Sequence, residues 1–382
     1  MKNCLIGAKR LLTPNGWEEN KVLTIEDGRI TRIATGTTAD FTAEILSPAP
    51  IDPHLHGGDG FDITKSSVEG MEAWLLRLAQ SGVGAILASP YTCPIDTMRE
   101  DLSIIRTVMK RQKEEGIPGA RLLGAHLEGP FISHNRPGAM CQEDIAVPSE
   151  KTCRQLLEGF EPIVREMSLA PEVPGAFEVI DYLKSIGVRI QAGHCDATFE
   201  EGEAAFERGV GSICHFFNAA RPIHHRDPSF LSAGIVHREI YAEMITDLVH
   251  LKPGAIRFLW TCKGPDRIIL ISDAVSTTNL PDGRYLDNGD WIEVINGASY
   301  NTASGTLNGG GTYLPGAVRN LVSLGVSADQ ALNAAAANAA RWLELDSGIR
   351  LGAEATLTGW DKDLQPLFTY AGGFLHRKEE VL

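Results

Sequence analysis

The chain has 382 residues, with 35 Lys and Arg against 49 Asp and Glu, which gives a formal net charge of −14. Its 43% of hydrophobic and 22% of charged residues are typical of globular proteins and exclude wholesale disorder. The acidic balance argues against a protein that binds nucleic acid or an anionic membrane, since such proteins normally present a basic surface. It does not exclude an anionic substrate, because charge interactions are screened within about 8–10 Å.

The cysteines and the N-terminus indicate where the protein works. Seven cysteines are scattered along the chain without a CxxC pair, which argues against a disulfide framework and favours a reducing compartment. The N-terminal stretch MKNCLIGAKRLLTPNG lacks the apolar core of a signal peptide. No stretch approaches the roughly 18–20 consecutive apolar residues that a membrane span requires. We therefore expect a soluble, cytoplasmic protein.

Both ends of the chain predict short strands. Period-two patterning and turn residues such as Asp27-Gly28 indicate a β-meander within residues 1–50, and the same texture returns in residues 348–382. Neither end alone could bury much apolar surface. The two ends are therefore predicted to form one small β-sandwich domain.

Residues 51–347 alternate between apolar strands and amphipathic helices. Helices are predicted at 67–81, 97–115, 174–185, 198–208 and 327–345. The eight predicted strands are 51–56, 84–91, 121–128, 164–171, 188–194, 212–217, 239–246 and 268–273. This count and length favour an α/β fold, a TIM-like (β/α)8 barrel. A doubly wound open sheet is the alternative, but no strand is followed by a glycine-rich phosphate loop.

Ionisable residues end five of these strands. The first closes with His54-Leu55-His56, and the others supply Glu128, His194, His215 and Asp273. In a barrel, the carboxyl ends of the strands converge on one rim, where active sites are built. Sequence positions far apart in the chain would thus meet at one place.

These residue types at the same strand ends indicate a metal site. His54 and His56 are two residues apart, so in a strand their imidazoles point to the same side. A single strand-end histidine is more often a hydrogen-bonded core residue, but four histidines and two carboxylates together favour one or two divalent ions.

Cys195 and Cys214, as strand neighbours of these ligands, are expected to face away as small buried apolar residues. The run Gly309-Gly310-Gly311 is expected to be a flexible rim turn or a close approach to a ligand.

The surrounding motifs are specific. The segments HLEGPF, AGHCDAT, CHFFNAARPIHHRDP and LISDA, which begin at His126, Ala192, Cys214 and Leu270, resemble the N-acetylglucosamine-6-phosphate deacetylase family of the amidohydrolase superfamily. The resemblance covers nearly the whole chain, including the split small domain. It implies a metal-dependent amidohydrolase of amino sugar metabolism.

The resemblance also implies roles for individual residues. Glu128, His194 and His215 correspond to the principal metal ligands, and His54 with His56 to a second metal position found in some members. Asp273 corresponds to the catalytic aspartate that moves the proton. The sugar phosphate would be held by Asn218, the Ala219 backbone and Arg226. His250 corresponds to a histidine that reaches a neighbouring subunit, which implies a homodimer. The metal would be zinc, with iron or another divalent ion as the alternative.

Three departures from the family pattern concern the substrate. Met140 stands where the family has a histidine that contacts the sugar, and Met makes no strong hydrogen bond. The usual DGxH reads Asp247-Leu248-Val249-His250, without the glycine, and the usual TLAGS reads TLNGG from Thr306. The predicted reaction is hydrolysis of the acetamide of N-acetylglucosamine 6-phosphate to glucosamine 6-phosphate and acetate. The alternatives are N-acetylgalactosamine 6-phosphate or another N-acyl amino sugar, and a non-catalytic barrel that binds a sugar phosphate.

Overall fold

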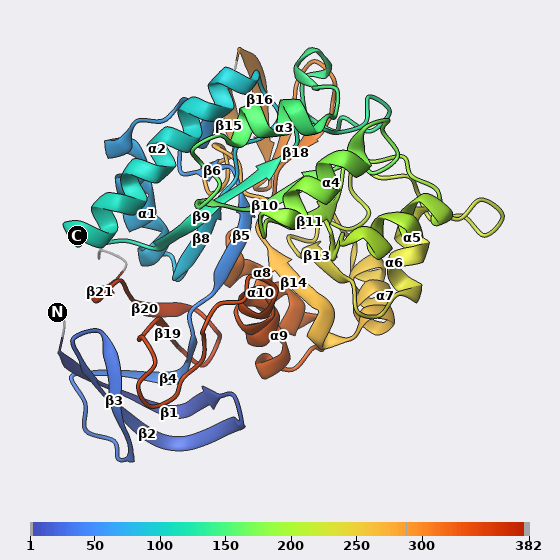
Figure 1. The fold of residues 1–382 in the computed structure, drawn as a ribbon. Helices are drawn as coiled ribbons and strands as arrows, with labels where there is room; N and C mark the ends of the chain where they lie inside the picture. The colour runs from blue at the N-terminus through green and yellow to red at the C-terminus, as the bar shows by residue number, and fades with distance from the viewer. Residues whose placement is uncertain (1–2, 288, 378–382) are drawn as a thin grey trace.

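Eight parallel strands form the centre of the molecule, and a separate sheet lies beside them (Figure 1). The structure is a computed structural model that describes residues 3–287 and 289–377. The backbone bonds Asp273 N to His54 O (2.9 Å) and His56 N to Ala274 O (2.7 Å) join the last strand to the first and close the barrel. The strands run in chain order as β5 (Ile51–Leu55), β8 (Ala85–Ala88), β9 (Arg121–Glu128), β10 (Val164–Leu169), β11 (Arg189–Ala192), β12 (Ser212–Ile213), β13 (Tyr241–Ile245) and β14 (Ile268–Ile271). The predicted barrel is confirmed.

Helices cover the outside of the barrel, and several begin at side-chain caps. Ser67 and Ser149 accept hydrogen bonds from the first turns of α1 (Val68–Gln80) and α3 (Glu150–Leu157), and Thr198 forms a complete capping box with Glu201 at α5 (Phe199–Arg208). The predicted helix 327–345 is two helices that meet at Ala336, whose φ of −134° departs from helical values. The helices are α1 (Val68–Gln80), α2 (Ile95–Glu114), α3 (Glu150–Leu157), α4 (Ala176–Ser185), α5 (Phe199–Arg208), α6 (Phe230–Val236), α7 (Pro253–Lys263), α8 (Leu314–Ser323), α9 (Ala328–Ala335) and α10 (Ala337–Trp342).

The two ends of the chain share one seven-stranded sheet with its own apolar core. Strand β4 (Phe41–Pro48) pairs with β1 (Cys4–Thr13) on one side and with β19 (Leu357–Trp360) on the other, so residues about three hundred positions apart are neighbours. Ile6, Leu23 and Tyr370 are fully buried between the two halves. The strands are β1 (Cys4–Thr13), β2 (Gly16–Glu26), β3 (Arg29–Thr35), β4 (Phe41–Pro48), β19 (Leu357–Trp360), β20 (Pro366–Ala371) and β21 (Phe374–His376). The boundaries at residues 50 and 348 remain predictions.

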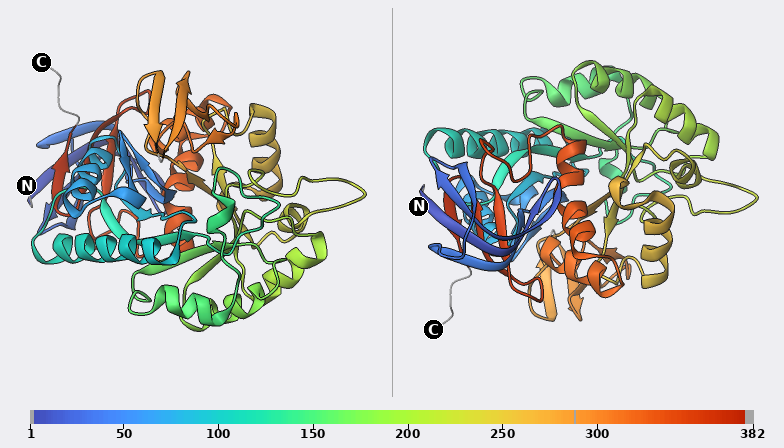
Figure 2. Two further views of the ribbon diagram at one scale, coloured as in Figure 1. Left: turned by 90° about the horizontal axis from the view of Figure 1, so that it is seen from above. Right: turned by 90° about the horizontal axis from the view of Figure 1, so that it is seen from below.

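A four-stranded antiparallel sheet is inserted between β14 and α8 (Figure 2, orange strands). The barrel pattern in the sequence does not predict it, although Asn296-Gly297 is a hairpin turn pair. It consists of β15 (Gly283–Asp287), β16 (Asp290–Ile295), β17 (Ala298–Asn301) and β18 (Leu307–Asn308). A small pair, β6 (Gly57–Gly58) and β7 (Phe61–Asp62), follows β5.

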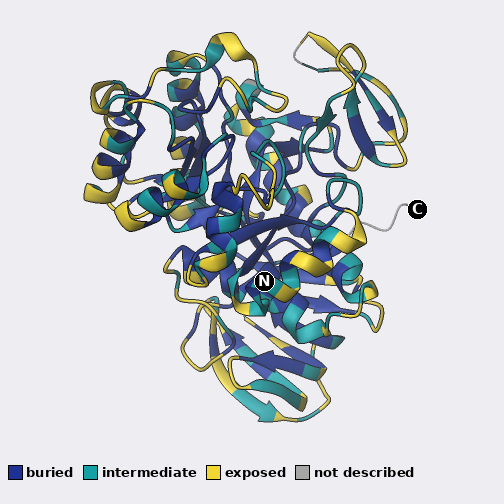
Figure 3. Ribbon diagram, turned by 90° about the vertical axis from the view of Figure 1, so that its right-hand side faces the viewer, coloured by how far each residue is buried: buried dark blue, intermediate teal, exposed yellow. Residues whose placement is uncertain are grey.

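Burial follows the layers of the fold. The barrel strands are buried along their length, and exposed residues lie on the outer helices, the connecting loops and the inserted sheet (Figure 3). Among the residues described, no helix combines the length and apolar character needed to cross a membrane.

Candidate metal centre and active site

Three of the expected site residues leave the extended conformation just beyond their strands. His194, His215 and Asp273 have φ values of 49°, 21° and 50°, two residues past the ends of β11, β12 and β14. This left-handed region costs a non-glycine residue about 1–3 kcal/mol and persists where the surroundings enforce it. The turned backbone directs each side chain into the mouth of the barrel.

The first cluster consists of Glu128, His194 and His215, all buried. Glu128 Oε1 lies 3.1 Å from His194 Nε2 and 2.9 Å from His215 Nε2, and the two nitrogens are 3.1 Å apart. Neighbouring ligand atoms of a tetrahedral zinc ion with bonds of about 2.0–2.1 Å are separated by roughly 3.3 Å. The spacing therefore fits one divalent ion.

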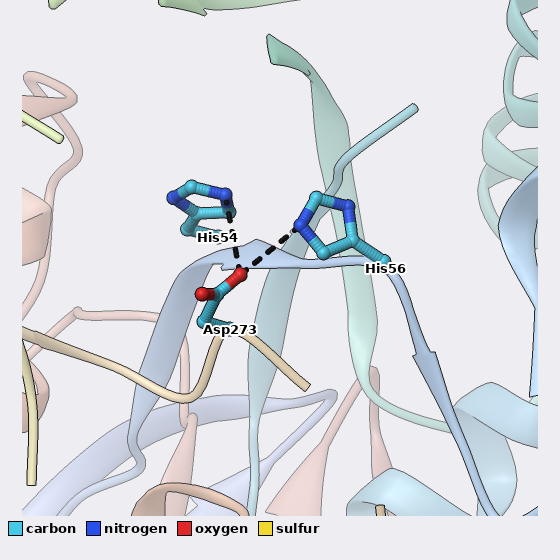
Figure 4. Close-up of side chains that lie close together, drawn as sticks. All are labelled: His54, His56 and Asp273. Carbon is cyan, nitrogen blue, oxygen red and sulfur yellow. Dashed lines mark hydrogen bonds and ion pairs between the residues drawn. The ribbon is translucent and has the colours of Figure 1, made fainter. Parts of the chain in front are cut away.

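The second cluster consists of His54, His56 and Asp273 (Figure 4). Asp273 Oδ1 lies 3.1 Å from His56 Nε2 and 3.6 Å from His54 Nε2. Glu128 connects the two clusters, because its Oε1 is 3.2 Å from His54 Nε2 and its Oε2 is 3.3 Å from His56 Nε2. Six ligand residues around one shared carboxylate have the composition of a site for one or two ions.

The hydrogen bonds of the Nδ1 atoms of His56 and His194 show that their Nε2 atoms are free to bind a metal. His56 Nδ1 lies 2.7 Å from the carbonyl of Ser89, and His194 Nδ1 lies 3.1 Å from the carbonyl of Arg136. A carbonyl only accepts, so each Nδ1 carries the proton and each Nε2 presents a lone pair. Buried lone pairs this close to carboxylate oxygens repel unless a cation or a proton lies between them. The residues present therefore fit a divalent metal.

Asp273 remains ionised in this environment. Burial raises its pKa, but the hydrogen bond with His56 and the nearby imidazoles outweigh burial and lower the pKa to about 2. By contrast, burial lowers the pKa of His126, directly beneath the clusters, to about 3 and keeps that ring neutral.

A cavity of about 740 Å³ opens above the two clusters. It brings together four of the five predicted substrate contacts, which are Met140, Asn218, Ala219 and His250. His250 lines the cavity of its own chain, where its Nδ1 lies 2.8 Å from Asp247 Oδ2. Burial raises the pKa of Asp247, but the hydrogen bond from His250 outweighs burial and holds the pKa below its usual value.

Arg226 is the exception among the predicted contacts. It lies in the exposed segment 222–228, on a loop that projects from the barrel (Figure 2), and it is absent from the cavity wall. Among the described residues, no Lys or Arg side chain lines the cavity. Outside the metal clusters, the cavity wall carries the acidic side chains of Asp62, Asp144, Asp287 and Asp290.

The inserted sheet, which the sequence pattern does not predict, supplies much of the cavity wall. Its contributions include Ile292, Asn301 and Asn308. The Asn308 Oδ1 atom is buried and has no hydrogen-bond partner among the described residues. A buried acceptor of this kind costs about 1–3 kcal/mol when it is left unpaired, so Asn308 is a ready acceptor for a donor on a bound molecule.

One expectation about a residue beside the ligands is wrong. Cys214 does not face away from the ligands, since its Sγ lies 3.6 Å from His54 Nδ1 and 3.9 Å from Glu128 Oε1. The left-handed turn at His215 breaks the strand alternation on which the expectation rested. In the run Gly309-Gly310-Gly311, the Gly310 amide donates to the Asp273 carbonyl at 2.6 Å, and an ideal Cβ on Gly310 would lie 1.8 Å from the Ser272 carbonyl oxygen. Gly309 lies on the cavity wall.

Comparison with known proteins agrees with this geometry. The model of the amidohydrolase family matches residues 45–374, and that of the N-terminal domain of formimidoylglutamate deiminase HutF matches residues 4–44. An N-acetylgalactosamine-6-phosphate deacetylase of Escherichia coli O157:H7 is 34% identical over 94% of this chain and 96% of its own. An N-acetylglucosamine-6-phosphate deacetylase of Vibrio furnissii is 32% identical over 82% of this chain and 79% of its own. A variant N-acetyl-D-glucosamine-6-phosphate deacetylase from Mycobacterium smegmatis, solved in complex with N-acetyl-D-glucosamine-6-phosphate, superposes with a TM-score of 0.90 at 28% identity, covering 99% of this chain and 100% of that one.

Proposed function

Since the chain belongs to the amidohydrolase family, we propose that it is a deacetylase that hydrolyses the acetamide of N-acetylglucosamine 6-phosphate to glucosamine 6-phosphate and acetate. The observation that carries the proposal is the convergence of histidine Nε2 lone pairs on the carboxylates of Glu128 and Asp273 at the floor of the cavity. A sensor that only binds a sugar phosphate has no use for this arrangement.

In the proposed reaction, the chain's own residues bind, orient and move a proton. Glu128, His194 and His215 would hold one divalent ion, and His54 with His56 would help to hold a second. The bound metal supplies Lewis acidity towards water and the amide carbonyl. Asp273 takes the proton of the attacking water on a carboxylate oxygen and returns it to the leaving nitrogen, because an unprotonated amine leaves badly.

The second substrate candidate differs from N-acetylglucosamine 6-phosphate in the configuration of one carbon. N-acetylgalactosamine 6-phosphate is supported by the 34% identical relative that is named for it. Met140 and Asn308, both on the cavity wall, are two of the positions where this chain departs from the family pattern. Asn308 offers an acceptor for a sugar hydroxyl or amide N–H, and Met140 offers only apolar contact.

We also propose a homodimer with zinc as the metal, in the cytoplasm. The cavity wall has no Lys or Arg among the described residues, so a sugar phosphate needs a cation from elsewhere, and Arg226 lies on a projecting loop that can reach a second copy. Zinc fits a site of imidazole and carboxylate ligands. The seven free cysteines agree with a reducing compartment.

Acetate release tests the proposed function. Metal-loaded protein would be incubated separately with the two epimeric N-acetyl sugar phosphates and with unphosphorylated N-acetylglucosamine, with Asp273→Asn as the control. We expect release from a phosphorylated sugar and almost none from the control. Substrate binding without turnover at every metal loading would contradict the assignment and favour a sensor.

A further inference from the structure

Glu243 is a fully buried carboxylate inside the barrel that the proposed reaction does not use. It lies on β13, points into the interior beneath the metal clusters, and has no exposed surface. An ionised carboxylate in such a place is costly unless several donors surround it. Its partners therefore indicate what it is for.

Three donors meet this carboxylate, and two of them belong to predicted metal ligands. Its Oε2 lies 3.0 Å from His54 Nδ1 and accepts from the backbone N–H of His215 at 3.3 Å. Its Oε1 accepts from Gln191 Nε2 at 2.8 Å. One carboxylate thus contacts a member of each cluster.

The contact with His54 determines which nitrogen of that ring can bind a metal. A carboxylate accepts the Nδ1 proton, so Nε2 carries the lone pair and faces Glu128 Oε1 at 3.2 Å. The Nε2 atom of His54 is buried and has no hydrogen-bond partner among the described residues. His56 and His194 are oriented by backbone carbonyls instead, whereas a carboxylate partner also raises the basicity of the imidazole.

A buried polar network fixes Glu243 in turn. Gln191 Oε1 accepts from Ser168 Oγ at 3.0 Å, and Ser168 Oγ lies 2.8 Å from His126 Nε2. The His126 ring packs edge-on against His54, with centroids 4.4 Å apart. Satisfied buried networks of this kind hold their members in one arrangement.

We infer that Glu243 is a positioning residue that holds His54 with its Nε2 atom towards Glu128 and Asp273, and that it is required for the second metal position of His54, His56 and Asp273. The inference rests on the metal centre of the proposed function. It concerns the number of ions held and does not depend on which sugar is the substrate.

The experiment counts metal ions rather than turnovers. Metal-free wild type, Glu243→Gln and Glu243→Ala would be titrated with Zn²⁺, and bound zinc per chain would be measured by elemental analysis after gel filtration. We expect two ions in the wild type. In Glu243→Gln the second ion binds roughly 10–100-fold more weakly, as is typical when the partner of a metal-bound histidine is changed, and in Glu243→Ala it is lost while the first is retained.

Glu166→Gln is the matched control. Glu166 is an equally buried carboxylate in the barrel, but it hydrogen-bonds Trp342 and Gln191, neither of which is a metal ligand. This variant should keep both ions. Thermal unfolding of the metal-free proteins shows whether Glu243→Gln is folded, so that a lost ion is not a sign of a lost fold.

The outcomes separate the two proposals. Equal zinc content and affinity in the wild type and both Glu243 variants overturns the role of Glu243 and leaves the deacetylase proposal standing. If the wild type binds one ion and neither variant changes its binding, the role of Glu243 is likewise overturned and the deacetylase proposal stands. A wild type that binds no zinc or other divalent ion overturns both proposals.

Discussion

Gly310 offers the sharpest test of how the fold positions Asp273. An ideal Cβ at this glycine would lie 1.8 Å from the Ser272 carbonyl oxygen, whereas real Cβ atoms do not approach within 3.0 Å. The φ of Gly310 is outside the left-handed region, so the substitution Gly310→Ala acts through crowding rather than backbone strain. Relief of the clash requires the two segments to separate by more than about 1 Å, the difference between these two distances.

The separation acts directly on the catalytic aspartate. The Gly310 amide donates to the Asp273 carbonyl at 2.6 Å, so moving Gly310 pulls on the backbone that aims this carboxylate. A misplacement of about 1 Å in a reacting group can cost about 100-fold in rate, and overpacking costs about 1–3 kcal/mol in the free energy of unfolding. We expect Gly310→Ala to lower kcat about 100-fold with little change in KM.

Gly283→Ala, in β15 of the inserted sheet, is the matched control. A methyl carbon at this position would have its nearest neighbours in Tyr285 at 3.7 Å, an ordinary contact, so both kcat and stability should stay near wild type. Steady-state acetate release and thermal unfolding measure the two effects, and zinc content shows that the Glu128 site is intact. If Gly310→Ala and Gly283→Ala have the same kcat, the packing of Gly310 does not position Asp273.

Three further predictions concern the metal and the substrate. Removal of the metal with a chelator should abolish acetate release, and Zn²⁺ should restore it. The chelator should also lower Tm reversibly, since a ligand that binds only the folded state stabilises it. Unchanged activity after metal removal would rule out a metal enzyme. Arg226→Ala should raise KM for the phosphorylated sugar roughly 10-fold or more, because a hydrogen bond to a charged group contributes about 1.5–3 kcal/mol. The same substitution should leave KM for the unphosphorylated sugar unchanged. Equal effects on the two KM values would show that Arg226 does not bind the phosphate. Met140→His should lower KM for the sugar phosphate about fivefold by adding one hydrogen bond of about 1 kcal/mol. A higher KM in steady-state kinetics would show instead that Met140 makes an apolar contact on which substrate binding depends.

The sequence predicts the barrel and the candidate ligands because both depend on local patterns. His54 lies in β5 and His56 directly follows it, and the two-residue alternation still places both rings beside Asp273. The same rule fails at Cys214, where the backbone of the next residue has a φ of 21°. Strand alternation therefore continues one residue past the end of β5 but not past the end of β12, where the backbone turns.

Other features depend on contacts between distant segments. Glu243 stands in the strand sequence YAEMI, and a lone glutamate among apolar residues indicates a buried partner without identifying it. That partner, His54, lies 189 positions away. The inserted sheet carries hairpin turn residues, but a barrel pattern does not predict which of its loops is extended, nor that this one walls the cavity.

The pairing of β4 with β19 determines the order in which parts of this protein can fold during synthesis. During synthesis a chain folds from its N-terminus, so β1 to β4 and the barrel strands leave the ribosome well before residues 357–376. Until those residues emerge, the side of β4 that will pair with β19 is an open strand edge, of the kind that invites pairing with other chains. The apolar core around Ile6 and Leu23 is completed by C-terminal residues such as Leu357, Phe368 and Tyr370. The terminal sheet is thus completed last, after the residues of the catalytic centre have already been made.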